Sequence, residues 1–202
     1  MRTKSDPKLI YDVGMHNGDD TAYYLWFRVV AIEPNPETLR TLRGNIEASG
    51  ASVIDVQPVA CTESEATLDF FAAPRSNTGE SSLSYANASE EGPVTKSYRV
   101  RGRPLDAIIK EARVSRVDAI KIDVEGAELL VLKGARDTLA AYHPLLVVEV
   151  IDRQLKAMGT SSVELTEFLR LHGYSAIQII STNIVFAPEN PVPLIKETQS
   201  TR

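Results

Sequence analysis

Short apolar runs alternate with amphipathic segments along most of this chain. Runs rich in Val, Ile and Leu predict five strands, at Leu9–Val13, Arg28–Ile32, Val53–Val59, Ala119–Val124 and Leu145–Val150. Between them apolar residues recur at helical spacing, as Leu39, Leu42 and Ile46 do after a start signal at Asn35 and Pro36. Strands that are apolar throughout and joined by helices are typical of a parallel sheet covered on both faces. The pattern therefore predicts an α/β fold.

Two parts of the chain depart from this alternation. Ser175–Ile180 and Asn183–Ala187 are apolar but too close together for a crossover helix, so we expect them to pair antiparallel. After a further predicted strand at Ala66–Ala72, residues 76–93 contain almost no large apolar side chain, which predicts a long flexible loop. Such a loop either closes over a ligand or is simply disordered or a surface excursion. With no internal repeat, residues 1–202 are expected to form a single domain.

Composition narrows the classes of function. The 202 residues are 43% hydrophobic, enough for a buried core. A net charge of −5 lacks the basic excess that gives affinity for phosphate backbones, so no nucleic-acid partner is expected. Cys61 is the only cysteine, which excludes an intramolecular disulfide and a cysteine-based zinc site. Polar residues 1–8 and the lack of an 18-residue apolar run predict a cytoplasmic protein with no membrane partner; oligomeric state is not specified.

Candidate ligand-binding residues follow the first two strands. The chain reads Asp12-Val-Gly-Met-His-Asn-Gly18, so two glycines flank a turn that leads into a predicted helix. Glycine lets the backbone approach a ligand closely, and helix amino ends offer free N–H donors. Glu33 ends the second strand, at an exposed strand tip where a carboxylate can accept both hydroxyl protons of a ribose. These features predict a nucleoside site with candidate contacts at Asp12, Gly14, His16, Asn17, Gly18 and Glu33.

The type of nucleoside follows from the spacing of the glycines. A nicotinamide cofactor would ask for Gly-x-Gly-x-x-Gly, whereas this turn has Gly-x-x-x-Gly, and no Gly-x-x-x-x-Gly-Lys phosphate loop occurs. Asp19 and Asp20 would repel a pyrophosphate but would tolerate a cationic sulfonium. S-adenosylmethionine is therefore the expected cofactor. An NAD-dependent oxidoreductase and a nucleoside-binding module without catalytic activity are the alternatives.

Acidic residues end the fourth and fifth long strands, at the edge where ligands bind in such sheets. Lys121 and Asp123 share one face, Glu125 follows, and Glu149 lies at the end of the next strand. We expect Asp123 to orient an acceptor hydroxyl or remove its proton, with Glu149, His16 and Glu125 as the next candidates. Glu125 has an alternative role as a cap of the following helix.

A metal is not expected in this site. The three histidines are dispersed and there is one cysteine, which argues against a transition metal. The open alternative is Mg²⁺, which prefers oxygen ligands of the kind that Asp123, Glu125 and Glu149 offer.

These motifs resemble those of one known family, the FkbM-type S-adenosylmethionine-dependent methyltransferases. The most specific similarity is Lys121-Ile-Asp-Val-Glu-Gly-Ala-Glu128, and further similar segments lie at 10–21, 30–36, 104–106 and 144–149. The resemblance implies a Rossmann-like class I methyltransferase fold with a mainly parallel seven-stranded sheet. It also implies methylation of a hydroxyl group on a small molecule, sugar or glycan.

The resemblance assigns roles to individual residues as well. It implies that Asp12, Gly14 and Gly18 shape the cofactor pocket and that Glu33 holds the ribose. The chain departs from the family pattern at Leu25–Trp26, where the connection between the first helix and the second strand is shorter.

Overall fold

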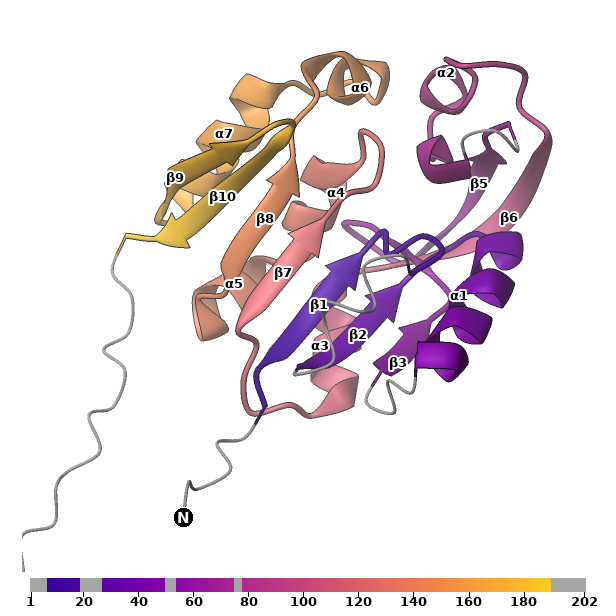
Figure 1. Cartoon of the computed structure of the whole chain (residues 1–202). Helices are drawn as coiled ribbons and strands as arrows, with labels where there is room; N and C mark the ends of the chain where they lie inside the picture. The colour runs from indigo at the N-terminus through magenta and orange to yellow at the C-terminus, as the bar shows by residue number, and fades with distance from the viewer. Residues whose placement is uncertain (1–6, 19–26, 50–53, 75–77, 190–202) are drawn as a thin grey trace, which may run out of the picture.

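Seven strands form the central sheet of the computed structural model, which describes residues 7–18, 27–49, 54–74 and 78–189 (Figure 1). Five of them run parallel: β1 (Leu9–Val13), β2 (Arg28–Ile32), β3 (Ile54–Gln57), β7 (Ala119–Ile122) and β8 (Leu145–Glu149). β9 (Tyr174–Ile180) and β10 (Asn183–Pro188) add an antiparallel hairpin, giving the order β3-β2-β1-β7-β8-β10-β9. The predicted mainly parallel sheet with its C-terminal hairpin is confirmed. The predictions for Asp19–Asp20 and Leu25–Trp26 fall outside the described residues.

The strand order reverses at β1, which lies between β2 and β7. In register, Asp12 of β1 pairs with Ala31 on one side and with Lys121 on the other. After β1 the chain continues to β2 and β3 on one side of the sheet, and after β7 it continues to β8 on the other side. The connections therefore diverge, and a crevice opens at the carboxyl ends of β1 and β7. The sequence motifs after β1, β2, β7 and β8 therefore meet at the carboxyl-terminal end of the parallel strands.

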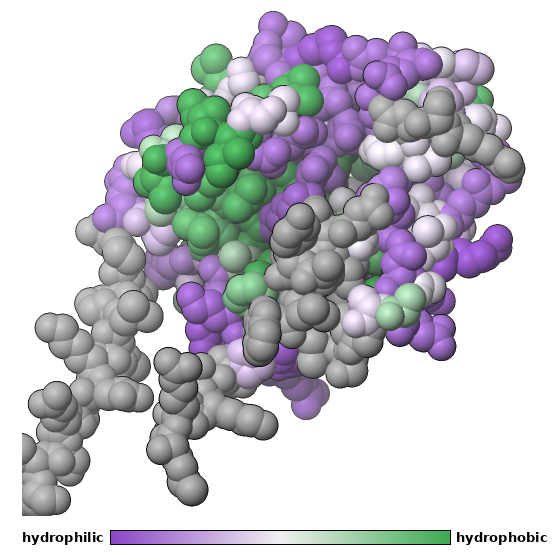
Figure 2. All heavy atoms as spheres, viewed as in Figure 1, coloured by the Kyte–Doolittle hydropathy of each residue, from purple (hydrophilic) through white to green (hydrophobic). Residues whose placement is uncertain are grey.

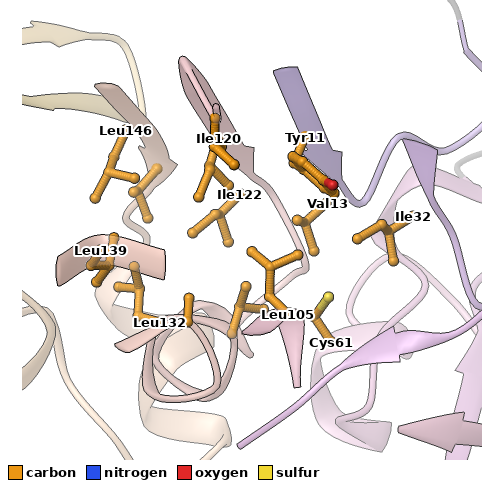
Figure 3. Close-up of a cluster of buried hydrophobic side chains, with 14 of the residues drawn as sticks. Tyr11, Val13, Ile32, Cys61, Leu105, Ile120, Ile122, Leu132, Leu139 and Leu146 are labelled. Carbon is orange, nitrogen blue, oxygen red and sulfur yellow. The ribbon is translucent and has the colours of Figure 1, made fainter. Parts of the chain in front are cut away.

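Most of the hydrophobic core lies on one face of the sheet. Four helices cover this face: α3 (Leu105–Ala112), α4 (Glu128–Lys133), α5 (Arg136–Tyr142) and α7 (Ser162–Leu171). In Figure 3 side chains of β1, β7 and β8, among them Val13, Ile122 and Leu146, face Leu105 and Leu132 of the helices. Each is fully buried or nearly so, and truncating such a leucine to alanine costs about 2–5 kcal/mol.

The opposite face carries a second, smaller cluster under α1 (Pro36–Ser49). Leu39 and Leu42 of this helix pack against Val29 of β2 and Met15 of the turn after β1. The helix starts as predicted, because the Asn35 side chain accepts a hydrogen bond from the backbone N–H of Glu37 at 3.0 Å. This start fixes the chain directly after β2, next to the crevice.

A three-stranded sheet lies between β3 and β7 in the chain. Its order is β4-β6-β5, with β4 at Ala60–Cys61, β5 at Ala66–Ala72 and β6 at Lys96–Arg103. Ala60, Phe70 and Val100 form its own buried cluster. Ala60 and Phe70 also line the cavity at the carboxyl ends of the large sheet, so this small sheet forms one wall of the site.

Residues 78–92 are more ordered than the long loop that the sequence predicted. They contain a 3-10 turn at Thr78–Glu80 and the short helix α2 (Tyr85–Ala88), and Ser82 pairs with Phe71 through two backbone hydrogen bonds of 2.9 and 3.0 Å. Ser82 and Ala88 are completely buried. Small and polar side chains anchor this segment, so counting large apolar residues underestimated its structure.

The outer edge of the large sheet is apolar and open. In β9, Ile177, Ile179 and Ile180 expose 62%, 72% and 53% of their surface, and Figure 2 shows apolar residues gathered over this hairpin and β8.

Among the described residues the one helix not yet named, α6 (Asp152–Ala157), lies between β8 and α7 in the chain. In the described part of the chain, every helix is too short or too polar to cross a bilayer.

Candidate active site

One cavity at the carboxyl ends of the strands collects most of the predicted site residues. Five of the nine line it, namely Gly14, His16, Glu33, Asp123 and Glu125. Asp12 lies buried behind the turn, Asn17 faces a neighbouring polar hollow, and Glu149 lies beside Asp123 at the end of β8. Residues more than 100 positions apart thus meet where the sheet topology predicts a ligand.

The turn after β1 is held tightly against both neighbouring strands. The N–H groups of Gly14 and Met15 donate to the carbonyl of Ile32, at 2.9 and 3.3 Å. Gly14 has φ +90°, and a Cβ there would lie 1.7 Å from the carbonyl oxygen of Asp123. Gly18 likewise has φ +78°. Glycine at position 14 is therefore required both by its backbone conformation and by the close approach of β7.

Glu33 is buried, in contrast to the exposed strand tip that the sequence suggested. Only 5% of its surface is exposed, because its carboxylate folds back over the turns that follow β1 and β2. It accepts hydrogen bonds from the backbone N–H groups of His16 (3.1 Å) and Asn35 (2.7 Å). Burial raises the pKa of Glu33 to about 7, although these two hydrogen bonds oppose the shift. The carboxylate that is expected to bind a ribose therefore also organises the pocket.

Lys121 lies between two predicted site acids. Its Nζ is 3.2 Å from Oδ2 of Asp123 and 3.8 Å from Oδ1 of Asp12. The Asp12 residue is only 1% exposed. A buried carboxylate needs such a counter-charge. Lys121 thus fixes the relative position of the acids at the ends of β1 and β7.

Three acidic side chains converge next to this lysine. Asp123, Glu125 and Glu149 place carboxylate oxygens within 4.8 Å of one another, close enough to share a cation. Burial together with the charges of Glu149 and Asp123 raises the pKa of Glu125 to about 8, and burial together with Asp123 raises the pKa of Glu149. This cluster of Asp123, Glu125 and Glu149, here called the acid corner, therefore favours binding a positive charge, either a proton or a cationic group.

Glu128 is a site residue that the sequence reasoning missed. It is 1% exposed, and its Oε1 accepts hydrogen bonds from the N–H groups of Val124 (3.2 Å) and Gly126 (3.1 Å). Burial raises its pKa to about 7. Glu128, the first residue of α4, therefore holds the turn that precedes the helix, whereas the helix start at Ala127 has no side-chain cap, from Glu125 or from Glu128. An acidic residue in the first turn of a helix is the signal that could have pointed to Glu128.

The segment at 78–92 closes the side of the cavity. Thr78, Gly79, Ser81 and Leu83 line it, and Nε2 of His16 lies 2.9 Å from the Thr78 hydroxyl. The turn after β1 and the segment after β5 are thereby joined across the cavity.

Solved structures with the same architecture define the fold. The crystal structure of methyltransferase FkbM from Methylobacillus flagellatus KT matches with a TM-score of 0.62 and 22% identity, over 93% of this chain and 45% of that one. An rRNA methylase from Streptococcus thermophilus matches with a TM-score of 0.52 and 13% identity, over 92% and 89%. At these identities the likeness shows the fold, which is that of the class I methyltransferases.

Sequence comparison defines the family. The sequence model of the family described as methyltransferase FkbM domain matches residues 12–176. The chain therefore belongs to this family of S-adenosylmethionine-dependent methyltransferases. The resemblance found in the motifs is thus confirmed.

Three curated relatives are 26–29% identical to this chain. The hexuronic acid methyltransferase AglP of Haloferax volcanii is 27% identical over 143 residues, which is 70% of this chain and 55% of AglP. The 2-O-methyltransferase NoeI of Sinorhizobium fredii is 26% identical over 75% of this chain and 66% of NoeI. The AMB antimetabolite synthetase AmbE of Pseudomonas aeruginosa is 29% identical over 73% of this chain, which spans 8% of AmbE. The chain therefore covers less than two thirds of each of these relatives.

Proposed function

We propose that this protein transfers a methyl group from S-adenosylmethionine to a hydroxyl oxygen of a sugar, a glycan or another small molecule. The observation that carries the proposal is the convergence of Gly14, Glu33 and Asp123, from three separate segments, on one cavity. The names of AglP and NoeI support a sugar as the acceptor class.

The residues present suit the cofactor. Glu33 offers a carboxylate for two ribose hydroxyls, and the backbone of Gly14, where a side chain would clash with the Asp123 carbonyl, forms part of the cavity wall. The acid corner at Asp123 and Glu125 provides negative charge for a cationic ligand. Bound there, S-adenosylmethionine would supply an electrophilic methyl group on its sulfonium.

The protein's own groups would act by positioning and by proton transfer. Holding the acceptor oxygen in line with the methyl group lowers the barrier through effective molarity. We assign to Asp123 the role of accepting the hydroxyl proton as the new C–O bond forms, because it lies between Lys121 and the other two acids. Glu125 and Glu149 would orient the acceptor and receive the proton in turn.

Binding and turnover test the proposal separately. Calorimetry is run with S-adenosylmethionine, S-adenosylhomocysteine and NAD. Methyl transfer from labelled donor is then measured on a panel of neutral sugars, uronic acids, glycans and hydroxylated metabolites. Labelled product from a hydroxylated acceptor supports the proposal. Binding of NAD in place of the two S-adenosyl compounds would point to an oxidoreductase, and binding without turnover on any acceptor would point to a nucleoside-binding module.

Asp123→Asn and Asp137→Asn serve as a matched pair in the same assay. Asp137 lies exposed on α5, away from the cavity. Transfer that is lost only in Asp123→Asn locates the chemistry at the end of β7.

A further inference from the structure

Glu125 has an unusual backbone conformation for a residue with a side chain. Its φ is +54°, in the left-handed region, and Gly126 follows at φ +101°. A non-glycine residue adopts this conformation stably only where its surroundings hold it, and such residues cluster at functional sites. The contacts that hold Glu125 therefore indicate how the acid corner is kept in place.

Three buried polar side chains hold this turn from outside. The backbone carbonyl of Glu125 accepts hydrogen bonds from the Ser82 hydroxyl (2.8 Å) and from Nδ2 of Asn87 (2.9 Å). The same Asn87 nitrogen donates to the carbonyl of Gln154 at 3.1 Å, and Nε2 of Gln154 donates to the carboxylate of Glu125. Ser82, Asn87 and Gln154 are 0%, 2% and 6% exposed. The turn is thus held by the 78–92 segment and by α6 together.

The packing around Gly126 shows how closely these groups fit. A Cβ at this position would lie 2.5 Å from Nδ2 of Asn87 and 2.5 Å from the carbonyl oxygen of Gln154. The Gly126 backbone therefore packs directly against the Asn87 amide and the Gln154 carbonyl, with no room for a side chain at this position.

Electrostatic repulsion makes such fixing necessary. Four acidic groups raise the pKa of Glu125: Asp123 at the end of β7, Glu149 of β8, Glu128 of α4 and Glu80 of the 3-10 turn. The nearby cation, Lys121, is paired with Asp12 and Asp123. When Glu125 is ionised, these like charges favour rotation of its carboxylate toward solvent. The amide of Gln154 opposes this rotation.

We propose that Ser82, Asn87 and Gln154 are positioning residues that hold Glu125 in its left-handed conformation and direct its carboxylate into the acid corner. The proposal rests on the function proposed above and extends it, because it makes the geometry of the corner depend on how the 78–92 segment is seated. A change in that segment would then lower the turnover rate with little effect on the affinity for S-adenosylhomocysteine, which lacks the sulfonium charge.

The test uses three variants in the full chain. Asn87→Ala removes both donors of that amide, and Gln154→Met keeps the length of the side chain while removing its donor. Ser89→Ala is the matched control, because the Ser89 hydroxyl, directly after α2, donates to the carbonyl of Ala86 at 3.2 Å rather than to Glu125. If Asn87→Ala does not fold, Ser82→Ala replaces it, since it removes the second donor to the same carbonyl.

The first readout is amide hydrogen exchange by NMR, which needs no acceptor. The N–H of Gly126 bonds to the buried Glu128 carboxylate at 3.1 Å and reports the local geometry. We expect its exchange to be at least tenfold faster in Asn87→Ala and Gln154→Met, unchanged in Ser89→Ala, and unchanged for Ile120 and Ile122 of β7 in all variants. Unchanged exchange at Gly126, or equal acceleration at Gly126 and in β7, would overturn the positioning role.

The second readout separates turnover from binding. We expect kcat to fall about 10- to 100-fold, the affinity for S-adenosylhomocysteine to stay within threefold of wild type, and neither variant to lower kcat further in a Glu125→Gln background. Additive losses, or a parallel fall in affinity, would overturn the inference and leave the proposed function standing. A wild-type protein that binds neither S-adenosyl compound would overturn the proposed function, and with it the extension.

Discussion

Replacing the buried Glu33 by glutamine should change the pH dependence of stability and weaken cofactor binding at the same time. The pKa of Glu33 rises from an ordinary value of 4.5 to about 7 in the folded protein, mainly because the side chain is buried. Between these two pH values the folded protein keeps a proton that the unfolded chain has released. The stability associated with this group is therefore present at low pH and is lost as the pH rises through 7.

The size of the effect follows from that shift. Between pH 5 and pH 8, a change in pKa from 4.5 to about 7 is worth about 2–3 kcal/mol of unfolding free energy. Glu33→Gln is neutral throughout and lacks this term. The variant gives up an acceptor for one of two backbone N–H groups, from His16 or Asn35, at a cost of about 1–3 kcal/mol that does not depend on pH. Glu33→Gln should thus be less stable than wild type at pH 5 and should approach or exceed it at pH 8.

Thermal unfolding measured from pH 5 to pH 8 tests this expectation. For a chain of 202 residues, 2–3 kcal/mol corresponds to a change of roughly 5–10 °C in the difference between the two Tm values. Glu125 and Glu128 also have raised pKa values, but both proteins contain them, so the comparison removes their contribution. Glu47→Gln, on the exposed side of α1, is the control and should show a constant difference.

Two results would refute the reasoning about Glu33. A Tm difference that stays constant from pH 5 to pH 8 would show that its pKa is not raised. Calorimetry at pH 8 should show affinity for S-adenosylhomocysteine reduced by about 1–3 kcal/mol, or roughly 5- to 150-fold. Unchanged affinity in a folded variant would remove Glu33 from ribose binding.

Three further changes test other parts of the site. Asp123→Asn should lower methyl transfer about 10²- to 10⁴-fold and leave the affinity for S-adenosylhomocysteine nearly intact; equal turnover in variant and wild type would place the base elsewhere. Gly14→Ala should abolish S-adenosylhomocysteine binding and lower the Tm, because the new Cβ meets the Asp123 carbonyl at 1.7 Å, whereas Gly44→Ala in α1 has nothing within 4 Å and should raise stability by about 0.5–1 kcal/mol. EDTA should leave methyl transfer unchanged; activity that disappears and returns with Mg²⁺ would make Asp123, Glu125 and Glu149 cation ligands.

The sequence predicted those parts of the fold that depend on local pattern. The parallel strands are continuous apolar runs, and the α1 start has Asn35 and Pro36. Candidate ligand residues were also found, because ligands bind at the carboxyl ends of strands and the motifs there are short and contiguous.

Features set by contacts between distant segments were not predictable in this way. The Ser82 hydroxyl meets the Glu125 carbonyl 43 positions away, and no local pattern marks either as a partner. Burial of Glu33 depends on where the turns after β1 and β2 pack. Glu128 sits three residues after Glu125 in an acidic stretch, so only the structure shows which of the two points inward.

The open edge of β9 affects how the isolated chain behaves in solution. Natural sheets commonly protect such an edge with lysine, proline or a short strand, and the seven residues of β9 contain no charged side chain and no proline. Among the described strands β9 pairs only with β10, so its outer side and its three exposed isoleucines form a template for intermolecular strand pairing. Self-association through this strand would rise steeply with protein concentration. Ile179→Lys is the substitution most suited to suppress it, because Ile179 is exposed and does not line the cavity, and the lysine adds charge to a strand that has none.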